Sequence, residues 1–182
     1  MGYNPTPHRR RSLRLKNYDY SRAGAYFITI CTKNRVCRFG NISDRQMNLN
    51  WIGRILQEEW MNIPKRFPRV RLDEFVVMPN HVHGLIFIQG GITSDASNKA
   101  NEKTILTVGG IVGAYKSLCT NRLLQRVRCR GSGRIIGTIW QRNYWERVVR
   151  NEIELDQIRK YIQTNPARWE EDGLFSADIM EI

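Results

Sequence analysis

The chain has 182 residues, of which 41% are hydrophobic and 25% are charged, so it is long enough for one globular domain with its own core. No apolar run approaches the roughly 20 residues of a membrane-spanning helix, and the four cysteines fall at neither disulfide-framework nor zinc spacing, which favours a reduced, cytoplasmic protein. Lysine and arginine outnumber aspartate and glutamate by 29 to 17, and this net charge of +12 favours a polyanionic partner such as nucleic acid.

Seven segments have the hydrophobic pattern of a regular element. In chain order, strands are expected over 25–32, 70–78, 81–88 and 135–140, and helices over 48–62, 104–127 and 151–163. The order strand–helix–strand–strand–helix–strand, followed by one more helix, is that of a split βαβ, ferredoxin-like fold. We therefore expect an α+β protein with an antiparallel sheet, two helices on one sheet face, an open second face and an extra C-terminal helix.

Charge divides the chain into three parts. Residues 1–15 form a basic arm that we expect to be flexible, residues 16–169 form the folded domain, and residues 170–182 form an acidic tail. Within the domain, no acidic residue occurs between Lys103 and Trp145. Such single-sign clustering is typical of a surface that binds a polyanion.

Two of the three histidines, His81 and His83, stand two residues apart in the expected strand 81–88. Side chains alternate between the two faces of a strand, so both imidazoles project from one face, which Leu85 and Phe87 continue. Two adjacent imidazoles make half of a site for a divalent metal. The same pattern also fits a histidine pair packed in the core against a helix.

The histidine segment, residues 75–84, reads FVVMPNHVHG and resembles the His-hydrophobic-His box of the one-tyrosine HUH transposases. More narrowly, it is similar to that of the REP-associated tyrosine transposases, which are IS200-like. Further blocks agree with this family in order and spacing, namely residues 18–32, 112–117, 140–144 and 161–166. The likeness extends over residues 13–169.

The resemblance implies single-strand DNA cleavage and rejoining near hairpin sequences, without ATP. A tyrosine hydroxyl attacks a backbone phosphate and leaves a 5′-phosphotyrosine linkage and a free 3′-hydroxyl. The resemblance also implies that His81 and His83 hold Mg²⁺ or Mn²⁺ against the scissile phosphate. It favours Tyr115 as the nucleophile, with Tyr144 as the alternative, although the apolar neighbours of Tyr115 also fit a core tyrosine.

Members of this family commonly carry an amide or acidic side chain one helical turn after the tyrosine as a third metal ligand. Cys119 stands there relative to Tyr115, and a thiol is a poor ligand for a hard cation. Asp73, Glu74 or water are alternative ligands, so the sequence leaves the third ligand open.

Eight basic residues are expected to contact DNA, and Trp140 or Tyr144 to stack on a base. These basic residues are Arg9, Arg10, Arg11, Lys116, Arg122, Arg126, Arg128 and Arg142. The partner implied is single-stranded or hairpin DNA and not a membrane, and the sequence leaves monomer and homodimer open. The rival interpretation is a non-catalytic nucleic-acid-binding module, either a degenerate transposase or an RNA binder on the same sheet.

Overall fold

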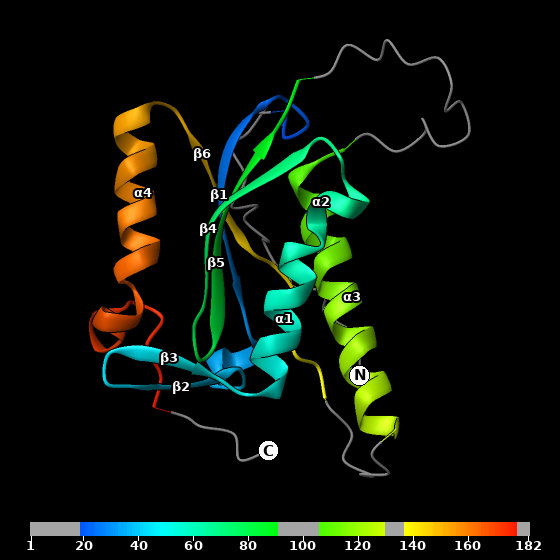
Figure 1. Ribbon diagram of the computed structural model, residues 1–182, viewed down its shortest axis with the longest axis vertical. Helices are drawn as coiled ribbons and strands as arrows, with labels where there is room; N and C mark the ends of the chain where they lie inside the picture. The colour runs from blue at the N-terminus through cyan, green and yellow to red at the C-terminus, as the bar shows by residue number, and fades with distance from the viewer. Residues whose placement is uncertain (1–18, 91–105, 130–136, 178–182) are drawn as a thin grey trace, which may run out of the picture.

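The computed structural model describes residues 19–90, 106–129 and 137–177 of the chain (Figure 1). The strands in this part are β1 (Gly24–Cys31), β2 (Gly40–Ser43), β3 (Gln46–Leu49), β4 (Val70–Val77), β5 (His81–Ile88) and β6 (Trp145–Val149). The helices are α1 (Trp51–Met61), α2 (Ile63–Arg66), α3 (Val108–Cys129) and α4 (Glu152–Thr164), with 3₁₀ turns at Lys33–Arg35 and Pro166–Glu171. No helix in these ranges is long and apolar enough to cross a membrane.

The main sheet of the described residues has the strand order β4-β5-β1-β6, and all neighbouring strands are antiparallel. α1 lies in the connection from β1 to β4, and α3 lies in the connection from β5 to β6. This order and connectivity are those of the split βαβ, ferredoxin-like fold, so the expected α+β class is confirmed.

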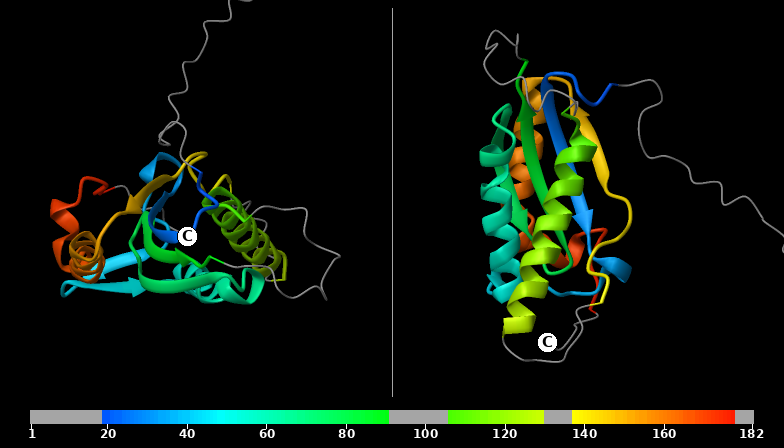
Figure 2. Two further views of the ribbon diagram at one scale, coloured as in Figure 1. Left: turned by 90° about the horizontal axis from the view of Figure 1, so that it is seen from above. Right: turned by 90° about the vertical axis from the view of Figure 1, so that its right-hand side faces the viewer.

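Helices cover both faces of this sheet (Figures 1 and 2). α1 and α3 pack on one face, in a core that includes Val82, Ile86 and Ile88 of β5. On the opposite face α4 buries a stripe of apolar side chains against Leu85 and Phe87. That stripe consists of Leu155, Ile158 and Ile162. Burying each of these side chains contributes about 1.5–3 kcal/mol to the free energy of unfolding. Because α4 covers the second sheet face, that face is not open, and the sequence prediction was wrong on this point.

The fourth strand lies elsewhere than expected. Residues 137–140 form no strand beyond a single bridge between Trp140 and Thr32, and residues 135 and 136 lie outside the described part. β6 at Trp145–Val149 takes the place beside β1 instead. Trp140 is 8% exposed and packs against Phe39, so its apolar character reflects core packing and not sheet pairing.

The expected helix 48–62 begins later, at Trp51, because β3 extends to Leu49 and Asn50 caps the helix. Its Oδ1 accepts hydrogen bonds from the backbone N–H groups of Ile52 and Gly53, at 2.9 and 3.0 Å. The β2–β3 hairpin that precedes it was not expected from the sequence. The other helices and strands lie within a few residues of their predicted positions.

Candidate active site

The histidine pair lies at one end of the sheet, on the face that α4 covers. β5 begins with His81, and Thr29 of β1 stands in register opposite His83. Both imidazoles are buried, at 0% and 2% exposure, and their Nε2 atoms are 2.9 Å apart. His83 stacks on Phe27, which packs in the cluster of Leu85 and Phe87, so both histidines lie on the face that strand alternation predicts.

Asn80 fixes the tautomer of His81. Its Nδ2 donates to the carbonyls of Arg35 and Leu174, at 2.9 and 2.8 Å, which sets the orientation of the amide. Its Oδ1 then accepts the hydrogen bond from Nδ1 of His81, at 2.8 Å. His81 therefore carries its proton on Nδ1 and presents a lone pair on Nε2.

Thr29 leaves the tautomer of His83 free to change. Its Oγ1 is 2.8 Å from Nδ1 of His83, and a hydroxyl can either donate or accept this hydrogen bond. With its proton on Nε2, His83 donates to Nε2 of His81. With its proton on Nδ1, His83 donates to Thr29, and two Nε2 lone pairs converge. The second arrangement is the one in which the pair can bind a cation.

Both histidines are neutral at physiological pH. Burial lowers the pKa of His81 to about 3, and the nearby Arg35 guanidinium acts in the same direction. Burial also holds the pKa of His83 well below its usual value, with His81 adding to the effect and Asp172 opposing it. A metal requires neutral imidazole ligands, so no proton needs to be displaced from an imidazolium.

Asp172 completes the cluster, since one of its carboxylate oxygens and a ring nitrogen of each histidine all lie within 4.8 Å of one another. The carboxylate accepts hydrogen bonds from the Asn165 amide at 2.7 Å and from the Leu174 backbone N–H at 2.6 Å. Asn165 is 3% exposed, and its Oδ1 has no hydrogen-bond partner among the described residues. Two imidazole nitrogens and a carboxylate oxygen form a donor set that fits Mn²⁺ or Mg²⁺.

Tyr161 of α4 borders this cluster. Its hydroxyl lies 3.2 Å from Nε2 of His83 and donates to Oδ2 of Asp172 at 3.2 Å. Burial and the Asp172 carboxylate raise the pKa of Tyr161 to about 12. The tyrosine remains 41% exposed and lines a cavity of about 640 Å³, which His83, Arg35 and Asp172 also line. A ligand in this cavity can therefore reach the phenol of Tyr161 and the imidazole of His83 together.

The two tyrosines favoured by the sequence lie on the other side of the sheet. Tyr115 is 1% exposed in the α1–α3 core, and its hydroxyl donates to the Leu56 carbonyl at 3.1 Å. Tyr144 packs against the same core, and its hydroxyl donates to Glu146 at 2.7 Å. The structure therefore does not bring either hydroxyl to the histidine pair, because the sheet separates them.

The third-ligand alternatives are also placed elsewhere. Cys119 is buried in the α1–α3 core. Asp73 accepts two hydrogen bonds from Arg159, at 2.9 and 2.8 Å, and Glu74 accepts one from Gln163 at 2.9 Å. In the described part of the chain, Asp172 is the acidic residue that clusters with the histidines.

Most of the basic residues expected to bind DNA are not at this site. Arg9, Arg10 and Arg11 lie outside the described residues, and Arg126 and Arg128 are exposed on α3, which covers the opposite face. Arg122 pairs with Glu58 and Glu59, and Lys116 donates to the carbonyls of Gln141 and Asn143. Arg142 is exposed and lines a separate hollow beside Arg35. Trp140 is too deeply buried to stack on a base.

Sequence reasoning missed several residues of the site. Tyr161 and Asn165 were recognised only as part of a family block, although their spacing of four residues places both on one side of a helix. Asp172 was assigned to the acidic tail. Thr29 and Asn80 likewise lie in family blocks, 18–32 and 75–84, but those blocks do not indicate their contacts with the histidines.

Comparisons with known proteins agree with this fold. No family model matches the chain. An uncharacterized protein of Haemophilus influenzae is 43% identical over 181 residues, which cover 95% of this chain and 97% of that protein. A solved structure of a REP-associated tyrosine transposase bound to a REP hairpin superimposes with a TM-score of 0.55 at 17% identity, over 93% of this chain and 92% of the other. The chain therefore belongs to the same family as the Haemophilus influenzae protein and shares the fold of that REP-associated tyrosine transposase.

Proposed function

We propose that the protein is a metal-dependent single-strand DNA endonuclease and strand transferase that acts near hairpin sequences, with Tyr161 as its nucleophile. The observation that carries the proposal is the Tyr161 hydroxyl, 3.2 Å from Nε2 of His83 at the edge of the His81, His83 and Asp172 cluster. The shared fold supports it, because the solved transposase with that fold is bound to a DNA hairpin.

His81, His83 and Asp172 would hold the metal, and Asn165 offers a further oxygen. Asn165 stands four residues after Tyr161, which is where the family resemblance calls for an amide or acidic ligand. A bound divalent cation would neutralise charge that develops on the phosphate oxygens and orient the phosphate for in-line displacement. Mn²⁺ suits the imidazole ligands better than Mg²⁺ does.

The Tyr161 hydroxyl attacks the scissile phosphorus. A bond forms between the phenolic oxygen and phosphorus, and the bond from phosphorus to the 3′-oxygen breaks. Asp172 accepts the hydrogen bond of the hydroxyl and is placed to take its proton, while the departing 3′-oxygen takes a proton from water and becomes a free hydroxyl. The phosphotyrosine bond stores the energy of the phosphodiester, so attack by a 3′-hydroxyl rejoins the strand without ATP.

Covalent capture tests this assignment. Wild-type protein mixed with Mn²⁺ and a labelled single-stranded hairpin should form a protein–DNA adduct that survives denaturing electrophoresis. Tyr161→Phe should abolish the adduct, whereas Tyr115→Phe and Tyr144→Phe should retain it, because their hydroxyls lie across the sheet. An adduct that persists in Tyr161→Phe would exclude Tyr161 as the nucleophile. DNA binding without any adduct would favour the non-catalytic alternative.

A further inference from the structure

A second hollow, of about 700 Å³, lies beside the candidate active site and is strongly basic. We call it the basic cleft, and its polar lining consists of Lys33, Asn34, Arg35, Thr138, Gln141 and Arg142. None of the described residues that line it is acidic. Arg35 also lines the cavity that contains Tyr161 and His83, so the two hollows meet at this arginine.

The backbone that presents Arg35 is strained and firmly held. Asn34 and Arg35 are consecutive left-handed residues, with φ of 59° and 56°, a conformation that an arginine rarely adopts. The Arg35 carbonyl accepts from Asn80 at 2.9 Å, and the Lys33 N–H donates to the Ile139 carbonyl at 2.7 Å. Asn80 therefore fixes both the histidine tautomer and the loop that joins the two hollows.

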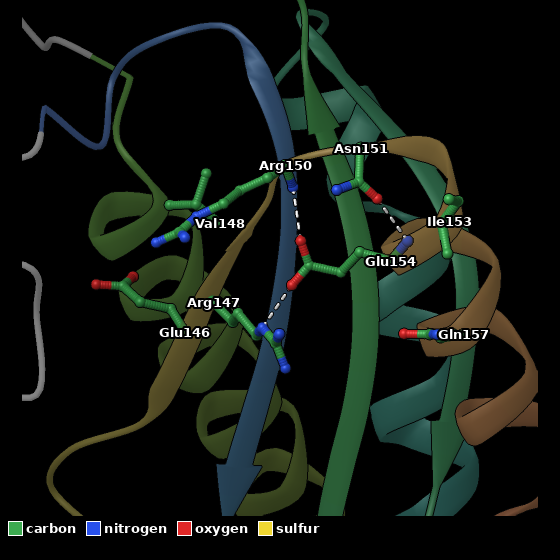
Figure 3. A pocket seen from close by; sticks show the side chains of 8 residues that line it. All are labelled: Glu146, Arg147, Val148, Arg150, Asn151, Ile153, Glu154 and Gln157. Atoms are coloured by element: carbon green, nitrogen blue, oxygen red, sulfur yellow. Dashed lines mark hydrogen bonds and ion pairs between the residues drawn. The ribbon is translucent and has the colours of Figure 1, made fainter.

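A rival hollow on the other side of the site is close to electrically neutral (Figure 3). It shares Arg147 and Glu154 with the cavity of Tyr161. Figure 3 shows the Glu154 carboxylate between Arg147 and Arg150, 2.6 Å from Nε of Arg147 and 2.9 Å from the backbone nitrogen of Arg150. Two acidic residues, Glu146 and Glu154, offset its two arginines, so a polyanion gains less there than in the acid-free cleft.

We propose that the basic cleft binds the phosphates of the single-stranded DNA that flanks the scissile phosphate. The proposal rests on the proposed function of the neighbouring site. Arg35 takes the phosphate next to the reacting one, and the exposed Lys33 and Arg142 take phosphates further along the strand. The contacts are electrostatic, so they position the strand without reading its sequence.

Fluorescence anisotropy with a labelled short oligothymidylate tests the cleft in metal-free buffer, where binding is measured without cleavage. Lys33→Glu and Arg142→Glu should each weaken binding about tenfold and reduce the salt dependence by about 0.7 in slope, as expected for one lost phosphate contact. Arg150→Glu in the rival hollow and Arg54→Glu, exposed on α1, make the same charge change and should each alter affinity less than about twofold. Thermal melting checks that all four variants fold.

The outcomes separate the cleft from the chemistry. The proposed role of the cleft would be contradicted by equal losses of DNA affinity in all four variants, by a larger loss in Arg150→Glu, or by no DNA binding in the wild type. If Lys33→Glu and Arg142→Glu bind DNA normally and the wild type forms a Tyr161 adduct on hairpin DNA, the cleft does not bind the strand, and the proposed function is still supported. If DNA binding depends on Lys33 and Arg142 but the wild type forms no adduct, the cleft binds DNA, and the proposed nuclease function is contradicted.

Discussion

The Thr29 hydroxyl can either donate a hydrogen bond to Nδ1 of His83 or accept one from it. Thr29→Val keeps the shape of the side chain but removes the acceptor that stabilises His83 with its proton on Nδ1. We expect Mn²⁺ affinity to fall by about 10–100-fold, the usual cost of losing an outer partner of a histidine ligand. Titration followed by electron paramagnetic resonance measures this, and Thr29→Ser should restore binding. Unchanged affinity in Thr29→Val would show that His83 does not depend on this hydroxyl.

Asp172 is the acidic member of the candidate metal site. Asp172→Asn keeps the size of the side chain and removes its charge, so we expect weaker Mn²⁺ binding and loss of the DNA adduct. Isothermal titration and covalent capture measure the two effects. Asp73→Asn is the matched control, because Asp73 pairs with Arg159 away from the histidines. A site that includes Asp172 is contradicted if the two variants bind Mn²⁺ equally.

At the scale of the elements, the contact between β5 and α1 depends on Gly84. A Cβ at this position would lie 2.1 Å from the ring of Trp60, which is 1% exposed. Gly84→Ala therefore overpacks the core, and we expect it to lower the free energy of unfolding by about 1–3 kcal/mol or more. Gly113→Ala, on α3 with nothing within 4 Å, should instead raise it by about 0.5–1 kcal/mol. Urea unfolding of both variants provides the measurement.

The sequence predicted which side chains share one face of a strand or helix, but it did not predict which sheet face each helix covers. Strand alternation placed His81 and His83 on the face of Leu85, and His83 does stack on Phe27 of the Leu85 cluster. Tyr115 and Tyr161 both lie on predicted helices, and periodicity alone does not tell which sheet face a helix covers. α3 covers one face and α4 the other, so the two tyrosines lie on opposite sides of the sheet. That choice depends on how the whole chain packs, which no local pattern records.

On the scale of the whole molecule, the buried histidines make stability depend on pH. Burial holds the folded pKa of both below the usual value of 6.5, so the unfolded chain binds protons first as the pH falls. Their contribution is fully present above pH 6.5 and is lost as the pH falls towards the folded pKa of His81, about 3. Urea unfolding of metal-free protein should show this decline, and His83→Gln should reduce its slope. A wild-type slope equal to that of the variant would contradict it.

The site combines segments that are far apart in the chain, which explains why the sequence located only half of it. The histidines come from a short motif, whereas Tyr161, Asn165 and Asp172 come from α4 and the turn after it. Asp172 looked like part of a charged tail because its role depends on the turn at Pro166–Glu171, after which it lies beside His81 and His83 of β5. Local sequence patterns predict contacts between neighbours in the chain, but they do not predict contacts between segments that are far apart in it.

This division has a consequence during protein synthesis. The ribosome completes His81 and His83 long before it reaches Tyr161 and Asp172. A nascent chain therefore lacks the complete site until Tyr161 and then Asp172 have left the exit tunnel. On the proposed function, such a chain cannot attach itself covalently to DNA. If the protein cleaves DNA as proposed, then in a cell where transcription and translation share one compartment the order of synthesis delays strand cleavage until the last part of the site has been made.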